Sequence, residues 1–454
     1  MKRQGWLGRW SAGLLLAGVV ALGAAGAAEG RNIGMVVGHG QGEVYVFDAD
    51  TDTLLAALPI GGGLYDCVVT QGGQGYVSDF TNKKIWIINL SNPGKPRLAG
   101  SIPLPIAVED ISLSADGRML LATDAGNGSP LLVIDLTTRT VKASVPAAGG
   151  YQSVEVCLDN TVLATSYYPE GTFEEYVLAG DGSLSLQGGV QPMISAINSA
   201  CEPEAGAAIG VMSSFYGGGG AIHLTGLPGI NLEPSGYQDL LGEGRSAVFS
   251  PRLDAVFTRN SCHIQRFPYD PDLLTLQPAD PAADWAVVGT DPDFGVDKIA
   301  VHPLGTKLYV PENGTGLTVF DADPVAYRGN ISLPITYRGE LTGVCLPALA
   351  RVAVDIDADV IDPASVDAVG VIIFGSPPRP VADIVKGSIA FVANAQAVGK
   401  PRTGDFDQDG QEDLLLLFRA IDLGTEPGDV TACLSGKFRD GAVFLACDVI
   451  DVAP

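Results

Sequence analysis

A short strand pattern recurs along most of the chain. Apolar or alternating runs rich in β-branched and aromatic residues end in polar turns, as at residues 44–47, 85–88, 132–134 and 317–320. Runs of this length bounded by turn residues predict β-strands. The acidic residue that closes such a run, for example Asp48, is expected to hydrogen-bond the backbone of the following turn.

A second pattern occurs in phase with the first. It consists of a strand, a tight turn and another strand, and its clearest copies cover residues 111–123 and 299–310. Weaker copies begin at Cys67, Val154, Ala196, Ala247 and Val344. Successive copies are roughly 42 to 52 residues apart, a period that is typical of the four-stranded unit of a β-propeller.

The copy at residues 299–321 resembles the YVTN family of β-propeller repeats. That unit reads approximately V-A-V-S-P-D-G-x-x-L-Y-V-x-N, followed by a V-x-V-I-D strand, and the resemblance extends over about residues 31–350. Residues 33–37 match the second strand of a unit and residues 342–346 match the first. We therefore expect an all-β fold, with a seven-bladed β-propeller over 31–348 that is closed by both chain ends. Six or eight blades stay open as alternatives, because the middle units are irregular.

The pattern changes after about residue 348. The later residues predict six short strands, at 352–356, 371–374, 388–393, 414–418, 430–434 and 443–447. We expect a small β-sandwich domain over 349–454. This order of elements is similar to a carboxy-terminal domain that is common in secreted bacterial proteins and carries a D-x-D-x-D-G loop. That resemblance implies secretion rather than a particular activity.

The second region contains an acidic loop with calcium-type spacing. Calcium takes six to eight oxygen ligands, and loops of this kind supply them from alternate positions. The expected ligands are Asp405, Asp407, Asp409, the backbone carbonyl of Gln411, and Asp413. The twelfth position is Leu416 instead of Glu, so the loop looks more like those of dockerin modules than a helix-loop-helix site. We expect structural calcium here; a solvated acidic turn is the alternative.

The N-terminus predicts export. Lys2, Arg3 and Arg9 accompany an uncharged apolar run at 11–25, and small residues follow at 25–28. This three-part pattern indicates a secretory signal peptide over 1–28, with a retained anchor as the alternative. We expect no membrane span in the mature chain, because no later apolar run approaches about 18 residues. The protein is therefore expected to be secreted or periplasmic, and bacterial.

Charge and cysteine content narrow the classes of partner and cofactor. Without the signal, 24 basic residues face 52 acidic ones, a net charge of −28, which argues against binding to nucleic acid. Seven cysteines without a C-x-x-C spacing give no haem or zinc signal. Cys433 and Cys447 flank a turn at 440–441, so they lie nearly opposite each other in a hairpin and are expected to form a disulfide. No pairing is assigned to the other five, which are Cys67, Cys157, Cys201, Cys262 and Cys345.

Polar residues at one mouth of the predicted propeller are the weak candidates for binding. Those expected on the rim loops are His39, Asp66, Asp110, Arg245 and Asp297, which together suit a cation or another polar ligand. Ordinary solvated loop residues are the alternative. We nominate no catalytic residues, because no G-x-S-x-G, H-E-x-x-H or phosphate-loop motif is present.

The sequence therefore favours a secreted, non-catalytic propeller that binds an unknown protein or polar ligand at its face, with a structural calcium site beyond it. A lactonase-type hydrolase that uses the acidic mouth is one alternative. A periplasmic partner of a redox enzyme is the other.

Overall fold

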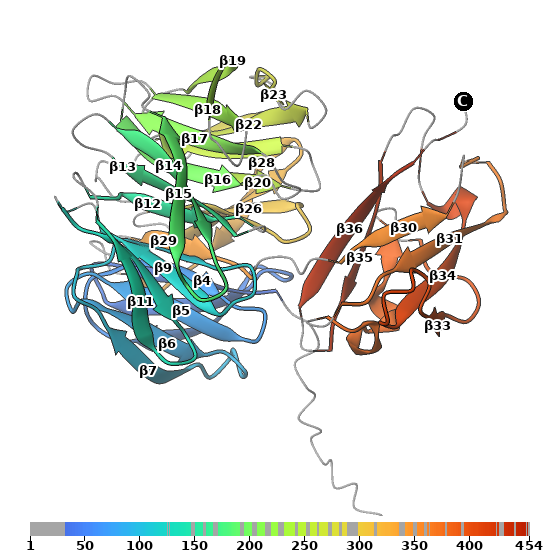
Figure 1. Ribbon diagram of the computed structural model, residues 1–454, viewed down its shortest axis with the longest axis horizontal. Helices are drawn as coiled ribbons and strands as arrows, with labels where there is room; N and C mark the ends of the chain where they lie inside the picture. Colours follow the sequence, from blue (N-terminus) through green and yellow to red (C-terminus); the bar gives the residue numbers. More distant parts are fainter. Residues whose placement is uncertain are drawn as a thin grey trace, which may run out of the picture.

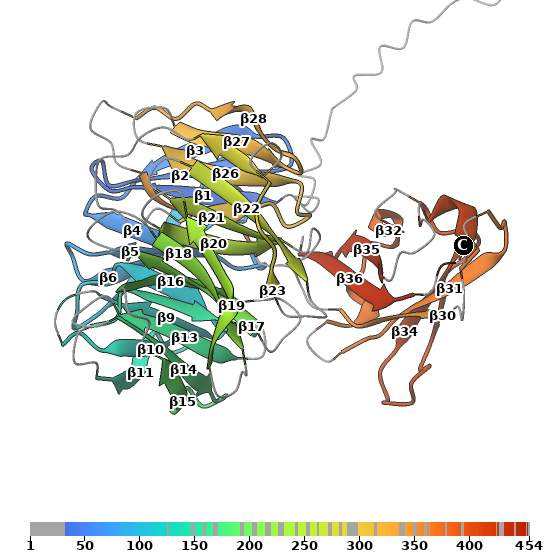
Figure 2. The same cartoon turned by 90° about the horizontal axis from the view of Figure 1, so that it is seen from above.

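The described part of the chain is all-β. The computed structural model describes residues 32–452 except for 125, 127, 147–149, 158–159, 167–170, 191–194, 202–206, 214–218, 226–230, 241–243, 251–254, 261–262, 271–274, 281–283, 288–297, 313–315, 336–340, 348–351, 358–360, 363, 377–378, 392–394, 424, 426–430, 440–441 and 451. The predicted signal peptide at 1–28 lies outside these residues. In Figures 1 and 2, strands up to β29 form one body and strands from β30 onward form a second.

The first body consists of seven antiparallel sheets among the described residues, six of four strands and one of five. From the inner to the outer strand, the first three sheets are β29 (Leu341–Cys345), β1 (Ile33–Gly38), β2 (Glu43–Asp48), β3 (Thr53–Pro59); β4 (Leu64–Val69), β5 (Gln74–Asp79), β6 (Lys84–Asn89), β7 (Arg97–Pro103); and β8 (Asp110–Leu113), β9 (Met119–Thr123), β10 (Leu131–Asp135), β11 (Thr140–Val145). The next two are β12 (Ser153–Val156), β13 (Thr161–Ser166), β14 (Thr172–Leu178), β15 (Leu184–Val190); and β16 (Ser195–Cys201), β17 (Ala207–Ser213), β18 (Gly219–Thr225), β19 (Asn231–Leu240). The last two are β20 (Gly244–Ser250), β21 (Ala255–Asn260), β22 (His263–Asp270), β23 (Thr275–Leu276), in which β24 (Trp285–Val287) also pairs with β22; and β25 (Ala300–Val301), β26 (Lys307–Glu312), β27 (Gly316–Ala322), β28 (Val325–Ile331).

The repeated sequence pattern produces a repeated local structure. As expected, the aspartate that ends the third strand binds the next turn: Asp48 Oδ1 accepts hydrogen bonds from the backbone N–H groups of Asp50 (3.0 Å) and Thr51 (3.1 Å). Asp135 does the same for Thr137 (2.8 Å) and Thr138 (2.9 Å). The carboxylate satisfies donors that the strand ladder leaves free, so the chain can reverse direction at the same point of each unit.

The alternating apolar residues form hydrophobic cores between neighbouring sheets. In one such cluster, Met35 and Val46 of the first sheet pack with Val77 and Ile88 of the second, and all four side chains are buried. Both faces of these sheets are therefore covered, which explains why strands such as β9 and β10 are buried throughout and mainly apolar. The fold of this body is propeller-like.

The two ends of the first body meet in one sheet. β29 pairs antiparallel with β1, with Met35 opposite Cys345 and Val36 opposite Val344. A disulfide then joins Cys345 to Cys67 of β4, with a Cα–Cα distance of 5.8 Å. The strand pairing connects the ends of the repeat region, and the disulfide connects that sheet to its neighbour.

The second body consists of two sheets. One has the order β30 (Val354–Asp357), β31 (Ala368–Ile373), β34 (Asp413–Arg419), β33 (Arg402–Gly404), and the other has β32 (Ala390–Phe391), β35 (Thr431–Lys437), β36 (Val443–Val449). Three single-turn 3-10 helices, η1 (Val381–Asp383), η2 (Lys386–Ser388) and η3 (Ala420–Asp422), lie between strands. One hydrophobic cluster includes Val371 and Phe418 from the first sheet and Leu434 and Phe444 from the second.

The disulfide between Cys67 and Cys345 is expected to stabilise the first body strongly. Replacing both cysteines with alanine should lower the free energy of unfolding by roughly 2–5 kcal/mol, because the bond closes a very long loop. The matched control replaces Cys157 and Cys201, which are joined across 44 residues rather than 278. Chain entropy predicts a smaller loss there, by about 1–2 kcal/mol. Urea unfolding measures both losses, and equal losses would contradict this ranking.

Candidate functional site

A polar residue lies within or just before every inner strand. The seven, which we call the inner ring, are Asp66, Asp110, Ser153, Asn198, Ser246, Lys298 and Thr342. Six lie within their strands and Lys298 lies two residues before β25. Every member except Lys298 is buried. Buried polar groups of this kind require hydrogen-bond partners.

The inner ring connects each sheet to the next. Asp66 Oδ2 accepts a hydrogen bond from Ile111 N (2.9 Å), and Asp110 Oδ2 accepts one from Val154 N (2.8 Å). The remaining links are Asn198 Nδ2 to Ser153 Oγ (3.0 Å), Ala247 N to Asn198 Oδ1 (3.3 Å), Ile299 N to Ser246 Oγ (3.3 Å), Lys298 N to Thr342 O (3.4 Å) and Thr342 Oγ1 to Leu64 O (3.1 Å). Each of the seven neighbouring pairs of sheets thus has a link at its inner edge.

Lys298 adds an ionic contact across the inner ring. Its ammonium lies 2.8 Å from Asp66 Oδ2 and also pairs with Asp110 Oδ1, although these carboxylates belong to two other sheets. Burial acts to lower the pKa of Lys298, but Asp110, Asp66 and Glu155 raise it well above its usual range. Lys298 therefore stays charged at neutral pH.

Asp66 and Asp110 have different protonation states, although both are buried beside Lys298. Burial, with further help from neighbouring Asp110, raises the pKa of Asp66 to about 8, and the Lys298 charge only partly offsets this. Burial acts the same way on Asp110, but Lys298 and the hydrogen bonds from Asp66 and Val154 hold the pKa of Asp110 below its usual range. Near pH 7, Asp66 carries the proton and Asp110 carries the charge that balances Lys298.

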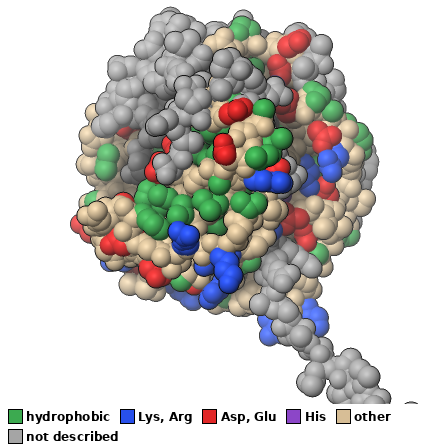
Figure 3. Space-filling view, turned by 90° about the vertical axis from the view of Figure 1, so that its right-hand side faces the viewer, with side chains coloured by type: hydrophobic (Ala, Val, Ile, Leu, Met, Phe, Trp, Pro, Cys, Tyr) green, Lys and Arg blue, Asp and Glu red, His purple; other side chains and the backbone are tan. Residues whose placement is uncertain are grey.

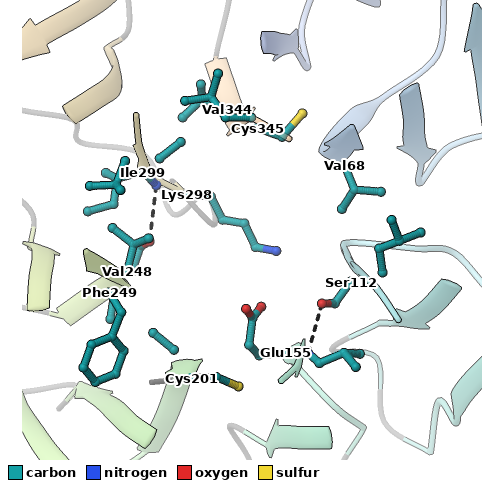
Figure 4. Close-up of a pocket in the computed structure, with 18 of the residues that line it drawn as sticks. Val68, Ser112, Glu155, Cys201, Val248, Phe249, Lys298, Ile299, Val344 and Cys345 are labelled. Carbon is teal, nitrogen blue, oxygen red and sulfur yellow. Dashed lines mark hydrogen bonds between the residues drawn. The ribbon is translucent and has the colours of Figure 1, made fainter. Parts of the chain in front are cut away.

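A central cavity of about 360 Å³ lies beside the inner ring and is lined by the inner strands of all seven sheets. Lys298, Asn198 and Ser246 border it at one level, and Pro303, Leu346 and Pro347, which follow inner strands, border it at another. Figure 4 shows the side chains of Lys298 and Glu155 pointing toward each other in this space. The cavity is within the size range of small-molecule sites.

Glu155 of β12 is the acidic residue in the wall of the central cavity. Burial is the main cause that raises the pKa of Glu155 to about 7; Asp110 adds to the rise, while Lys298 and a hydrogen bond with Ser112 oppose it. The side chain therefore changes charge close to neutral pH.

The residues expected on the rim do not form one group in the structure. Asp66 and Asp110 come together, but on the inner strands and only 2% and 0% exposed, instead of on solvent-facing loops. The expectation of an open acidic mouth is therefore wrong for these two, because the neighbouring strand supplies N–H donors that hold the carboxylates inside. His39 has its Nδ1 3.2 Å from Leu64 O, the carbonyl that also accepts the hydrogen bond from Thr342, and its ring lies against Tyr65. Asp297 and the side chain of Arg245 lie outside the described residues.

Sequence reasoning missed Lys298 and Glu155. The signal that could have revealed Lys298 is the repeat itself, since aligning the inner strands places it at the position of Asp66 and Asp110. Glu155 is two residues after Ser153 of the inner ring, on the same face of its strand. The signal that could have revealed Glu155 is an acidic residue at a position that is mainly apolar in the other inner strands.

The acidic loop of the second body is preorganised by its own hydrogen bonds. One oxygen each of Asp405, Asp407 and Asp413 lies within 4.8 Å of the others. Asp413 is fully buried and accepts hydrogen bonds from Gly375 N (2.9 Å) and Phe406 N (2.7 Å). Asp409 is outside this group of three, and its Oδ1 accepts a hydrogen bond from Gln411 N (2.7 Å). The three clustered carboxylates suit a hard cation.

The hairpin expected near the C-terminus is present. Cys433 of β35 and Cys447 of β36 are directly opposite in the strand register, and Cys433 is disulfide-bonded. The side chain of Cys447 lies outside the described residues, so the bond between these two cysteines stays a prediction. The disulfides from Cys67 to Cys345 and from Cys157 to Cys201 indicate an oxidising compartment. Cys262 lies outside the described residues.

Comparison with known proteins shows the fold alone. No protein-family model and no curated protein matches this chain. A protein of unknown function from Desulfotomaculum acetoxidans is similar in structure, with a TM-score of 0.55 and 14% identity over 70% of this chain and 99% of that one. Kuenenia stuttgartiensis hydrazine synthase aligns with a TM-score of 0.47 and 10% identity over 63% and 89% of the two chains. Of the helices in the described residues, none has the length and apolar character needed to cross a membrane.

The buried acids are expected to make stability fall as pH rises. The pKa values of Asp66 and Glu155 are raised to about 8 and about 7, so each favours the folded state while protonated. That contribution is complete below their ordinary values near 4 and is lost as pH rises through the raised values. The melting temperature should drop by several degrees between about pH 5 and pH 9, and Glu155→Gln should flatten the profile. Asp181→Asn, which removes an exposed charge from the same sheet, is the control. Because Asp66 keeps its raised pKa in Glu155→Gln, part of the slope should remain, and a profile as steep as that of the parent protein would contradict the assignment.

Proposed function

We propose that this protein is an exported, non-catalytic binding scaffold built on a closed seven-bladed β-propeller followed by a small β-sandwich. The observation that carries the closed ring is the set of seven links between neighbouring sheets at the inner ring, together with the pairing of β29 and β1. A closed ring of this kind is held together on every side, and it leaves only the outer strand of each sheet as an edge. Both properties suit a protein that presents a surface outside the cell.

The buried carboxylates already have partners inside the protein, which supports a binding function rather than catalysis. A hydrolase of the lactonase type would need carboxylates that reach substrate or hold a metal. Asp66 and Asp110 instead bind Lys298 and backbone N–H groups of the neighbouring strands. If these carboxylates bound a substrate or a metal instead, the N–H donors that they now bind would be buried without partners, which costs about 1–3 kcal/mol for each group. Partnership with a redox enzyme stays an untested alternative.

The distribution of charge supports a partner other than nucleic acid. On the face in Figure 3, Lys and Arg side chains of the described residues are interspersed with Asp and Glu. The whole chain, including its N-terminal segment, has a formal charge of −25. Binding to phosphate backbones depends on concentrated positive charge. An unidentified protein or a small polar ligand is the better fit.

The non-catalytic assignment is tested with the purified mature protein and a panel of lactones. We expect the hydrolysis rate to equal that of buffer alone, with and without added calcium. The inner-ring variant Asp110→Asn serves as the comparison, together with circular dichroism to verify its fold. Hydrolysis by the parent protein that disappears in folded Asp110→Asn would contradict the proposal and favour the lactonase alternative.

We further propose that the acidic loop binds calcium through Asp405, Asp407 and Asp413, with Asp409 and the Gln411 carbonyl completing the site, and that this calcium stabilises the second body. Bound calcium would reduce repulsion among the clustered carboxylates. Excess chelator should lower the melting temperature of the full chain, and Asp407→Asn should remove most of that response. Asp362→Asn, another exposed aspartate of the same body, should keep it. A melting temperature that chelator leaves unchanged would argue against structural calcium.

A further inference from the structure

We propose that the central cavity binds a small organic ammonium ion with an apolar body, and that the carboxylate of Glu155 is its counter-ion. This inference rests on the proposed binding function and names a ligand class for it. Its basis is the composition of the cavity wall, the charge balance around Glu155 and the arrangement of the inner strands.

The wall of the central cavity is apolar at the level of Glu155. The residues two positions after the inner ring share one face of the inner strands, because side chains alternate along a strand. They are Val68, Ser112, Glu155, Ala200, Val248, Ala300 and Val344, and all line the cavity. Five are apolar, and the polar pair, Ser112 and Glu155, is hydrogen-bonded together. A ligand that fills this level therefore meets hydrocarbon on most sides and one carboxylate.

Among the described residues, acidic groups outnumber basic ones around the cavity. Asp66, Asp110 and Glu155 act on one another and on Lys298, the basic residue in the described part of the wall. Lys298 already pairs with the two aspartates, and no described residue forms an ion pair with Glu155. An added cation would complete the charge balance, whereas an added anion would face an excess of carboxylate.

The ligand must be an organic cation rather than a metal ion. Calcium needs six to eight oxygen ligands, and this level of the cavity offers the oxygens of Glu155 and Ser112 among apolar side chains. A primary ammonium needs only a few acceptors, and its hydrocarbon part gains free energy by leaving water for the apolar wall. The cavity volume of about 360 Å³ leaves room for such a body.

Binding should strengthen as the pH rises through neutrality. The pKa of Glu155 is about 7 in the ligand-free protein, so the carboxylate is about one-tenth ionised at pH 6 and about nine-tenths ionised at pH 8. The other titratable groups that face it are Lys298, which stays charged, and Asp110, which stays ionised; Asp66 titrates near pH 8 and adds negative charge in the same direction. Cys157, Cys201 and Cys345 of the wall are in disulfides. We expect about a tenfold gain in affinity between pH 6 and pH 8.

The test is calorimetric titration of the full mature chain with n-hexylammonium, whose amine stays charged over this pH range. n-Hexanol and hexanoate are the neutral and anionic probes of similar shape, and calcium is the inorganic cation. Hexylammonium should bind at least tenfold more tightly than either organic probe, and excess calcium should not displace it. Glu155→Gln should weaken binding at least tenfold and remove most of its pH dependence, leaving the smaller part due to Asp66, whereas Asp181→Asn should leave both affinity and pH dependence unchanged.

Several results would overturn this proposal. They are equal affinity for hexanol and hexylammonium, undiminished binding by folded Glu155→Gln, displacement by calcium, or no binding of hexylammonium at all. Glu155→Asp, which keeps the charge, supplies a second variant if Glu155→Gln does not fold, and its binding should keep the rise with pH. Absence of amine binding leaves the scaffold proposal intact, since the lactone assay tests that separately.

Discussion

Hydrogen bonding from each inner strand to the next is the constraint on which the rest of this structure depends. A polar side chain placed at the start of a buried strand costs free energy unless a partner is close. In this protein the partner belongs to the neighbouring sheet, as when the Asp66 carboxylate accepts a hydrogen bond from Ile111 N. A sheet that shifted along its neighbour would lose that bond and bury both groups unpaired. The inner ring therefore sets the register between sheets, while the hydrophobic cores between them supply most of the stability.

Lys298 extends this constraint across the centre of the molecule. A buried ion pair is weak support for stability, because desolvation offsets much of the attraction between the charges. Its effect is better described as positional: one ammonium contacts Asp66 and Asp110, which belong to two different sheets. The contact engages the only described lysine of the cavity wall, and no described residue forms an ion pair with Glu155. The structural role of Lys298 thus determines the chemical character of the cavity beside it.

The sequence predicted the elements of the fold better than it predicted the site. Strand and turn patterns such as 299–321 correspond to β25, β26 and β27, because local alternation and turn residues specify those elements directly. Asp66 and Asp110 were identified but placed on the solvent side, since nothing local shows that the next strand offers N–H donors to them. Lys298 and Glu155 were missed because nothing local to either strand shows that its side chain faces charged residues of other sheets. The positions of Cys433 and Cys447 opposite each other could be predicted, because they lie in one local hairpin. Cys67 and Cys345 are 278 residues apart, and their pairing depends on how the chain ends meet.

The two described disulfides of the first body bear directly on the cavity. Cys157 and Cys201 connect the strand of Glu155 to its neighbour β16, and Cys67 and Cys345 connect β4 to β29 on another part of the wall. Covalent bonds between adjacent inner strands hold the wall in one arrangement before any ligand arrives. A preorganised wall lowers the entropic cost of binding, so that even a small ligand with one charged contact can reach measurable affinity. Hydrogen bonds on one level and disulfides on the next therefore act together: the inner ring fixes where each strand starts, and the disulfides fix how far apart the strands lie at the cavity.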